Sequence, residues 1–298
     1  MQKRGNTHII RVVEEIGLDD EESFGTRNEY IVKDGKTGKI LYHDLNLTVL
    51  GGRLALIEDS FNVASNLEQH LLLNDTMGIA HSATQSVFTS NMRRGIDYFM
   101  VGDGAKSPTV PNQVAKARNY ETRLYNAIPF RFRKVTEDLS AEEQKKYRLK
   151  KQITIQGVDY YGYFAKKITF TGSSGSNAKL VITDYNGVKF LPEDKYTVPV
   201  AKDDTQHPLS GGSVKVYLAF SLEVDQDECK EYFKVVNGNL DGACINETAL
   251  IKAIDLPNAN NGDQLELAAA EVFAKLTEKS QDLDETTSRV VKYKVYAR

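Results

Sequence analysis

The chain has no tryptophan and only two cysteines, Cys229 and Cys244, among its 298 residues. Two cysteines are too few for a disulfide framework, so reduced thiols are expected, with a single bridge as the alternative. No apolar stretch approaches the roughly 18–20 residues that a membrane-spanning helix needs. The opening MQKRGNTHIIRVVEEIGLDDEE has a broken apolar run followed by acids, which is not typical of a secretory signal. We therefore expect a soluble protein that is made in a cytoplasm and has no membrane partner.

Motifs for metals and nucleotides are missing as well. The five histidines show no HxH or HExxH spacing and there is no CxxC pair, so zinc is not expected. Gly35-Lys36-Thr37 lacks the earlier glycine of a phosphate-binding loop, and Gly102-Asp103-Gly104 lacks the third glycine of a dinucleotide fingerprint. Asn237–Gly242 resembles half of a calcium loop, but Thr248 stands where the bidentate glutamate belongs. These segments are interpreted as turns, and no cofactor or metal is predicted.

No catalytic constellation is recognisable in the sequence. Gly172-Ser-Ser-Gly175 has the wrong spacing for a nucleophile elbow. A glycosidase-type acid pair leaves no local signature, and 41 acidic residues give no basis for choosing one. The chain is predicted not to be an enzyme, with carboxylate chemistry left open.

The aromatic residues, 15 Tyr and 12 Phe, favour a β-rich protein. Strands and hairpins are predicted over 7–16 (with a short helix as the alternative), 29–45, 47–57, 96–101, 130–133, 149–170, 179–190, 213–224, 265–277 and 290–296. Helices are predicted near 65–73, 112–126, 140–147 and 246–254, with a capped helical turn at 225–228. Helices and strands do not alternate as βαβ units require. The predicted fold class is α+β and β-dominated, with antiparallel, sandwich-like sheets and a few short helices.

Three local signals are the clearest. Ser140 and Glu143 form a capping box, in which each side chain can bond the other residue's backbone amide. Asn186-Gly187 lies between apolar arms, which is the strongest short hairpin signal. Phe130-Arg131-Phe132-Arg133 alternates and predicts a half-buried strand with its arginines facing outward.

The segment Gly172–Asn177 (GSSGSN) is flexible by composition and is the best candidate boundary. It separates an N-terminal and central region, 1–171, from a β-rich C-terminal region, 178–298. The alternative is one continuous domain.

Positive charge is concentrated between Ala115 and Lys151, where eleven Lys and Arg stand against five Asp and Glu. That surplus of six leaves nine net negative charges for the rest of a chain whose net charge is -3. Interleaved aromatics would suit base stacking on single strands, but core aromatics with solvated cations explain the pattern better. A basic face opposite acidic surface also favours binding to copies or neighbours in an ordered assembly. The candidate interface residues are Arg118, Arg123, Arg131, Arg133, Lys145, Lys146 and Arg148.

Four segments in this part of the chain, VGDGA, ARNYETRLYNAIPFR, DLSAEEQKKYRLKK and YYGYFAKKI, are similar in order and spacing to virion structural proteins of contractile-tailed bacteriophages. The ending VFAKLTE…VVKYKVYA is similar to them too. The nearest family is the baseplate wedge proteins of such tails. The resemblance implies a β-rich, non-enzymatic subunit that packs around a tail as a homodimer or other homo-oligomer. The candidate interface residues come from charge and periodicity, because no family motif carries them over.

The sequence therefore predicts a virion structural protein of a contractile tail, assembled in the host cytoplasm, whose partners are other tail and baseplate proteins. The first alternative is a carbohydrate-binding or carbohydrate-degrading tail-associated β-domain. The second alternative is a protein that binds single-stranded nucleic acid, a partner that is not expected.

Overall fold

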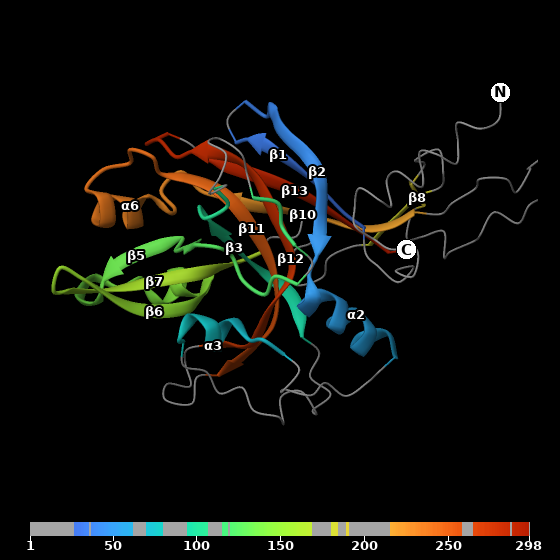
Figure 1. The fold of residues 1–298 in the computed structure, drawn as a ribbon, viewed down its shortest axis with the longest axis horizontal. Coiled ribbons are helices and arrows are strands. Elements are labelled where there is room, and N and C mark those ends of the chain that lie inside the picture. Colours follow the sequence, from blue (N-terminus) through green and yellow to red (C-terminus); the bar gives the residue numbers. More distant parts are fainter. Residues whose placement is uncertain are drawn as a thin grey trace, which may run out of the picture.

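The computed structural model describes residues 27–35, 37–61, 70–79, 94–106, 115–118, 120–168, 180–183, 189–190, 215–257, 265–286 and 288–297. Strands dominate this part of the chain and the helices are short (Figure 1). The strands are β1 (Arg27–Asp34), β2 (Ile40–Thr48), β3 (Gly95–Gly102), β4 (Ala127–Ile128), β5 (Arg131–Lys134), β6 (Tyr147–Ile155), β7 (Val158–Lys167), β8 (Leu180–Thr183), β9 (Lys189–Phe190), β10 (Lys215–Val224), β11 (Cys244–Pro257), β12 (Leu265–Asp282) and β13 (Arg289–Ala297). The helices are α2 (Leu50–Phe61), α3 (Leu73–Met77), α5 (Ala141–Gln144) and α6 (Lys230–Asn237), with a 3-10 turn at Val135–Glu137. The predicted α+β, β-dominated class is confirmed.

Hydrogen bonds connect 13 strands of the described part in the order β5-β7-β3-β11-β12-β2-β1-β13-β10-β8-β9, with β4 on β3 and β6 on β7. All these pairs are antiparallel. The two halves of this path are joined through a narrow link, where Thr48 and Leu47 of β2 pair with Ala274 and Lys275 of β12. Strands that precede residues 172–177 in the sequence lie next to strands that follow them. For example, β3 lies beside β11, and β1 lies beside β13.

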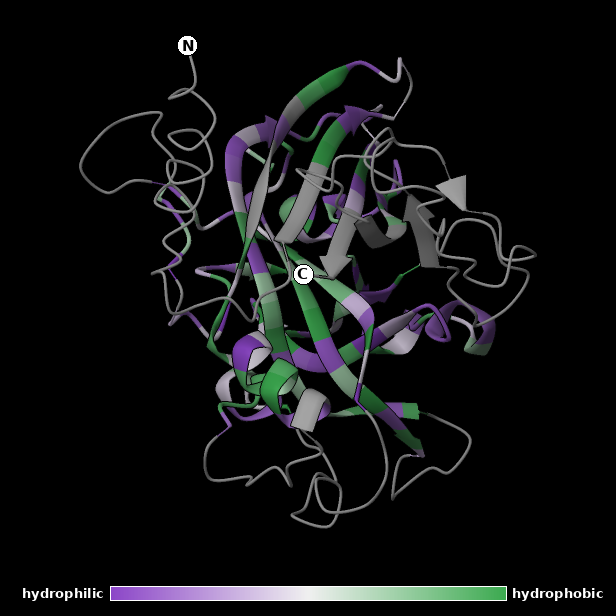
Figure 2. Cartoon of the chain, turned by 90° about the vertical axis from the view of Figure 1, so that its right-hand side faces the viewer, coloured by the Kyte–Doolittle hydropathy of each residue, from purple (hydrophilic) through white to green (hydrophobic). Residues whose placement is uncertain are grey.

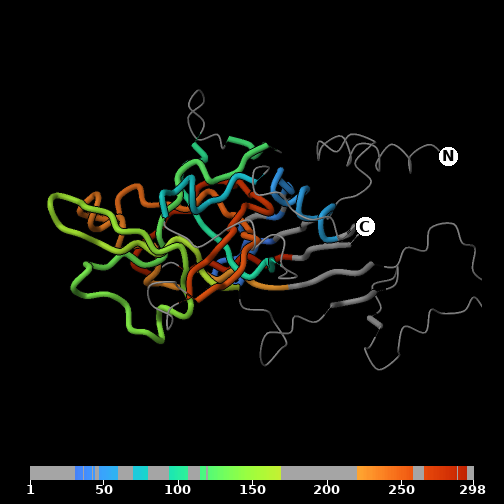
Figure 3. The backbone as a smooth tube through the Cα atoms, turned by 90° about the horizontal axis from the view of Figure 1, so that it is seen from below, coloured from blue at the N-terminus to red at the C-terminus, as the bar shows by residue number. Residues whose placement is uncertain are grey.

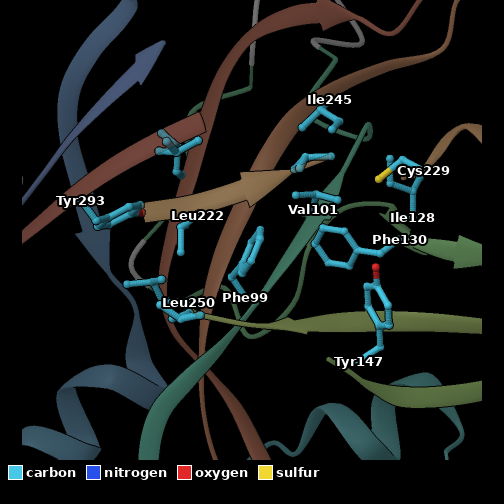
Figure 4. Close-up of a cluster of buried hydrophobic side chains, with 14 of the residues drawn as sticks. Phe99, Val101, Ile128, Phe130, Tyr147, Leu222, Cys229, Ile245, Leu250 and Tyr293 are labelled. Atoms are coloured by element: carbon cyan, nitrogen blue, oxygen red, sulfur yellow. The ribbon is translucent and has the colours of Figure 1, made fainter. Parts of the chain in front are cut away.

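The narrow link lets one half of the sheet pack over the other. Leu222 of β10 and Tyr293 of β13 share a buried cluster with Phe99 of β3 and Leu250 of β11 (Figure 4). Each such side chain contributes about 1.5–3 kcal/mol when it is fully removed from water. This cluster is the core between two layers, as in a sandwich.

A second cluster lies on the other face of β3 and β11. Tyr98 and Ala249 point to this face and pack with Leu73 of α3 and Leu124 of the segment 120–126. β3 and β11 are therefore covered on both faces, as continuous apolar runs predict. Figure 2 shows hydrophobic and hydrophilic stretches alternating along the strands, and Figure 3 shows the β6–β7 hairpin and α6 together at one end.

Several local predictions are confirmed. The 29–45 hairpin is β1 paired with β2, and its turn holds Gly38 at a φ of 67°. The 149–170 hairpin is β6 paired with β7 around Gly157. Ser140 and Glu143 form the predicted capping box at α5. β8 and β9 pair as predicted, while their turn at 186–187 lies outside the described residues.

The predicted strand pair at 47–57 is wrong beyond Thr48, because residues 50–61 form α2. The glycines that suggested a turn serve close packing instead. A Cβ on Gly52 would lie 2.1 Å from the Phe273 carbonyl oxygen of β12, and one on Gly51 would lie 2.8 Å from that of Val272. Only glycine lets this helix rest on the strand's backbone.

Two predicted helices are also wrong. Residues 115–118 and 120–126 of the expected 112–126 helix are irregular, and 112–114 and 119 lie outside the described residues. The expected 246–254 helix is part of β11. Each of residues 244–254 is buried, so β11 shows no alternation that would distinguish it from a buried helix. The predicted strand at 7–16 and the boundary at 172–177 lie outside the described residues. Of the helix expected near 65–73, residues 65–69 lie outside them as well, residues 70–72 are not helical, and Leu73 begins α3.

Both cysteines are free and buried, which confirms the expected reduced thiols. Within the described part, no helix is long and apolar enough to span a membrane.

Replacing Gly52 by alanine tests the close contact between α2 and β12. Alanine favours a helix by about 1 kcal/mol over glycine, but overpacking against backbone costs about 1–3 kcal/mol. Because the new Cβ meets a carbonyl that cannot rotate away, we expect Gly52→Ala to lower the free energy of unfolding in urea titrations. Ile57→Ala, at an exposed position of α2, is the control and should change it little. A more stable Gly52→Ala protein would contradict the close contact.

Candidate functional site

The cations between residues 115 and 151 divide into a buried set and an exposed set. Arg131 and Arg148 are 7% and 6% exposed, so the prediction that they form a contact face is corrected. Arg131 lies 2.5 Å from Asp227 and 3.3 Å from Glu231, and Arg148 lies 2.7 Å from Asp255. These guanidinium groups neutralise carboxylates within the chain. The expectation that Arg131 faces outward is wrong, because its strand is covered by residues 227–231.

The exposed set contains the other candidates. Arg133 is partly exposed and lies 2.7 Å from Glu231, and Lys145 lies 2.6 Å from Glu142. Lys146, Arg118 and Arg123 are exposed. Lys145 and Lys146 follow α5, whereas Arg118 and Arg123 lie in the irregular segment beside β3.

Arg118 and Arg123 line an open cleft of about 510 Å³, here called the basic cleft. Lys106 adds a third cation, and Tyr120 and Tyr125 add ring surface that is 60% and 44% exposed. Arg118 donates a 2.7 Å hydrogen bond to the Tyr120 hydroxyl, which raises the pKa of the guanidinium. Among the described residues, Glu121 is the one acid that lines the cleft. The basic cleft thus presents two net positive charges beside two tyrosine rings.

The irregular segment that forms the cleft is held by Glu247 of β11. Glu247 has no exposed surface, and its carboxylate accepts hydrogen bonds from the backbone amides of Gly104 (2.8 Å), Tyr125 (2.7 Å) and Asn126 (3.1 Å). These bonds explain why residues 120–126 do not form a helix. Their amides point into the protein at a carboxylate instead of along a helix axis.

Lys275 of β12 neutralises this buried carboxylate. Its ammonium lies 3.1 Å from Glu247 and 2.7 Å from Glu121, and 3.4 Å from the centre of the Tyr125 ring. Burial raises the pKa of Tyr125, and its hydroxyl donates to Glu121. The floor of the basic cleft is therefore a buried network in which one ammonium contacts two carboxylates, and it fixes the exposed rings and cations above it.

Similar buried networks occur elsewhere in the body. His70 bridges Glu58 (2.9 Å) and Glu271 (2.8 Å), and Arg94 contacts both carboxylates. These groups join α2 and β12 to the segments around residues 70 and 94. This network makes α2 part of the rigid body.

Glu228 forms a further network below α6. It has no exposed surface, lies 2.8 Å from the Lys166 ammonium, and accepts a 2.5 Å hydrogen bond from the Tyr147 hydroxyl. Burial raises the pKa of the Glu228 carboxyl above its ordinary value of 4.5, although Lys166 and the hydrogen bonds lower it. The predicted capped turn is present, because Glu228 accepts a 2.7 Å hydrogen bond from the Asp225 amide.

The expected turn at 237–242 is confirmed and lines a second open depression of about 660 Å³. Asn239 accepts a 3.0 Å hydrogen bond from the Asp241 amide, and Gly242 has a φ of 73°. This depression, here called the acidic hollow, is lined by Asp241, Asp282, Asp284, Glu285 and one cation, Lys234. No group of three potential metal ligands gathers anywhere in the described part of the chain.

Sequence reasoning did not identify Glu247 or Lys275. Glu247 was assigned to a helix, and Lys275 to an ordinary strand. The sequence does hold a signal for such a pair, because Glu271 and Lys275 interrupt an apolar run. A charged residue that is buried with such a run needs a buried partner of opposite charge. The partner itself is not visible in the sequence, because it lies on another strand.

Fold and site together define a β-rich, two-layer protein with a rigid charged cleft. The chain belongs to a family of unknown function, DUF7208, whose model matches residues 47–294. The match includes the basic cleft, the acidic hollow and all the buried networks described above. No curated protein and no solved structure matches the chain.

Glu247→Ala tests the anchoring of the basic cleft. The change leaves three backbone amides without their acceptor and Lys275 without one of its carboxylates. Removing one partner of a buried ion pair costs about 3–5 kcal/mol, so we expect the free energy of unfolding to fall by that amount. Hydrogen exchange should show faster exchange at the amides of Gly104, Tyr125 and Asn126.

The control is Glu142→Ala, which removes an exposed pair worth about 0–1 kcal/mol. Unchanged protection of the three amides in Glu247→Ala would show that the carboxylate does not hold the segment.

Glu228→Gln tests the buried carboxyl below α6. Because the folded pKa of Glu228 is raised, its contribution to stability is complete below the unfolded value near 4.5 and is lost as pH rises through the folded value. Glutamine cannot release a proton, so the variant should gain stability relative to the unmodified protein as pH rises from about 4.5. The gain is about 1.4 kcal/mol for each unit by which the folded pKa is raised.

Urea unfolding across this pH range measures the effect. Glu143→Gln is a control of opposite sign, since hydrogen bonds from Ser140 lower the pKa of Glu143. If Glu228→Gln instead lost stability with rising pH, the attraction of Lys166 would outweigh burial.

Proposed function

We propose that this protein is a virion structural protein of a contractile phage tail, a baseplate wedge-like subunit that acts through protein–protein interfaces. Its partners are other tail and baseplate proteins and further copies of itself. It is assembled in the host cytoplasm and resides in the virion. It holds neighbours in register and performs no reaction.

The observation that carries this proposal is the division of the cations of residues 115–151. Arg131 and Arg148 are buried and neutralise carboxylates from other elements. Arg118 and Arg123 are exposed around the rings of the basic cleft. Arg and Tyr are the residue types that dominate binding energy in protein interfaces.

Rigidity supports a structural role as well. The networks of His70, Lys275 and Glu228 each join elements that are distant in the sequence. A buried charge pair is costly to separate, so these elements resist moving apart. A subunit that holds register needs this property more than it needs mobile loops.

The resemblance adds support from the same part of the molecule. VGDGA ends β3, ARNYETRLYNAIPFR contains the exposed cleft residues, and YYGYFAKKI is β7. The first two segments line the basic cleft, and β6 and β7 contribute Tyr147 and Tyr163 to the core that also holds Val101 and Ile128.

The buried aromatics favour this proposal over single-stranded nucleic acid. Phe130, Phe132 and Tyr147 lie in the interior, where they cannot stack on bases. Only Tyr120 and Tyr125 of the five interleaved aromatics are exposed. Exposed tyrosines beside cations also suit an acidic sugar, so a glycan-binding tail domain is the second candidate function.

The test is recovery of the protein in tail particles purified from the virus that encodes it. We expect a fixed number of copies per tail, and a several-fold loss of incorporation for Arg123→Glu because it reverses charge in the basic cleft. Lys39→Glu, in the exposed β1–β2 turn, makes the same charge change elsewhere and should be incorporated normally.

Absence of the protein from purified tails would overturn the proposal. Binding of Arg123-dependent acidic glycans on an array, with no tail association, would favour the second candidate.

A further inference from the structure

The basic cleft and the acidic hollow are neighbours on the molecule. Lys106 lines the cleft and Asp282 lines the hollow. The segment that carries Lys106 lies against Asn246 of β11, which accepts a 2.9 Å hydrogen bond from the Ala105 amide and donates a 3.1 Å hydrogen bond to the Asp103 carbonyl oxygen. Burial raises the pKa of the Cys244 thiol, while Lys106 lowers it and Asp282 raises it. Asp282 also pairs directly with Cys244 in the β11–β12 register. The two depressions therefore share one border at the start of β11.

The two depressions carry opposite charge. The cleft has Lys106, Arg118 and Arg123 against Glu121, which shares the Lys275 ammonium with Glu247. The hollow has four acids against Lys234, which lies 2.7 Å from Glu285. The cations of the cleft and the acids of the hollow are all exposed to solvent.

A surface that holds adjacent patches of opposite charge is complementary to the same surface on a second copy. When two copies face each other across a twofold axis, the positive patch of each copy meets the negative patch of the other. The same arrangement disfavours a nucleic acid, because the phosphates that the cleft attracts would lie beside four carboxylates.

We infer that a second copy of this chain docks on this face, with the acidic hollow of each protomer on the basic cleft of its partner. This inference deepens the proposed function, on which it rests, by naming the surface through which copies join. Tyr120 and Tyr125 supply exposed ring surface within the cleft for this contact. Exposed charges across such an interface are screened by salt, so association is strongest at low ionic strength.

Reciprocal charge reversal tests the inference. The first variant carries Lys106→Glu and Arg123→Glu, so that its cleft and its hollow are both negative. The second carries Asp282→Lys and Glu285→Lys, so that both are positive. Sedimentation velocity and light scattering measure the mass of each protein alone and of an equimolar mixture.

We expect the unmodified protein to be a dimer at low salt and to dissociate at high salt. Each variant alone should bind itself at least about tenfold more weakly, because like charges face each other. The equimolar mixture should restore a dimer that contains one copy of each variant. Restoration also shows that both variants are folded.

Lys39→Glu is the control and should leave dimerisation unchanged. A monomer at every salt concentration, dimers that survive both reversals, or a mixture that stays monomeric would overturn the inference. Growth into species larger than dimers would overturn the twofold arrangement. Binding of single-stranded DNA by the monomer, abolished by the first variant, would assign the cleft to nucleic acid instead.

The two proposals fail separately. A protein that is recovered in tails but is monomeric when pure refutes only the docking surface. A protein that dimerises through these charges but is absent from tails refutes only the proposed function.

Discussion

Glu247 and Lys275 lie on neighbouring long strands and have almost no exposed surface. A buried carboxylate is tolerated only when it is paired and hydrogen-bonded, and three amides from an irregular segment complete its set. The pairing therefore fixes more than two side chains. It holds the segment 120–126 against the sheet, and with it the exposed rings and cations of the basic cleft.

The other networks extend the same constraint through the body. His70 joins the region of α2 to β12, and Glu228 joins the region of α6 to β6 and β7. Such networks add little net stability compared with apolar packing, but removing one charged partner destabilises the folded protein strongly. They favour one arrangement of the sheets over alternatives, and this suits a protein whose proposed role is to keep neighbours in register.

Local signals in the sequence were reliable where a short stretch decides its own structure. The capping box at Ser140 and the hairpin turn near Gly38 each rest on residues within a few positions of one another. The site was only partly predictable. Arg118 and Arg123 were identified from charge, but Arg131 and Arg148 have the same chemistry and are buried.

What the sequence by itself determined is the β-rich class, most strands, the reduced cysteines and the concentration of positive charge. What only the tertiary structure decided is which of those charges reach the surface, why Gly51 and Gly52 lie in a helix, and why residues 120–126 do not. The physical reason is the same in each case. The deciding partners are the carboxylates of Asp227 and Asp255, the backbone of β12 and the carboxylate of Glu247. Each is distant in the sequence and becomes a neighbour only when the chain has folded.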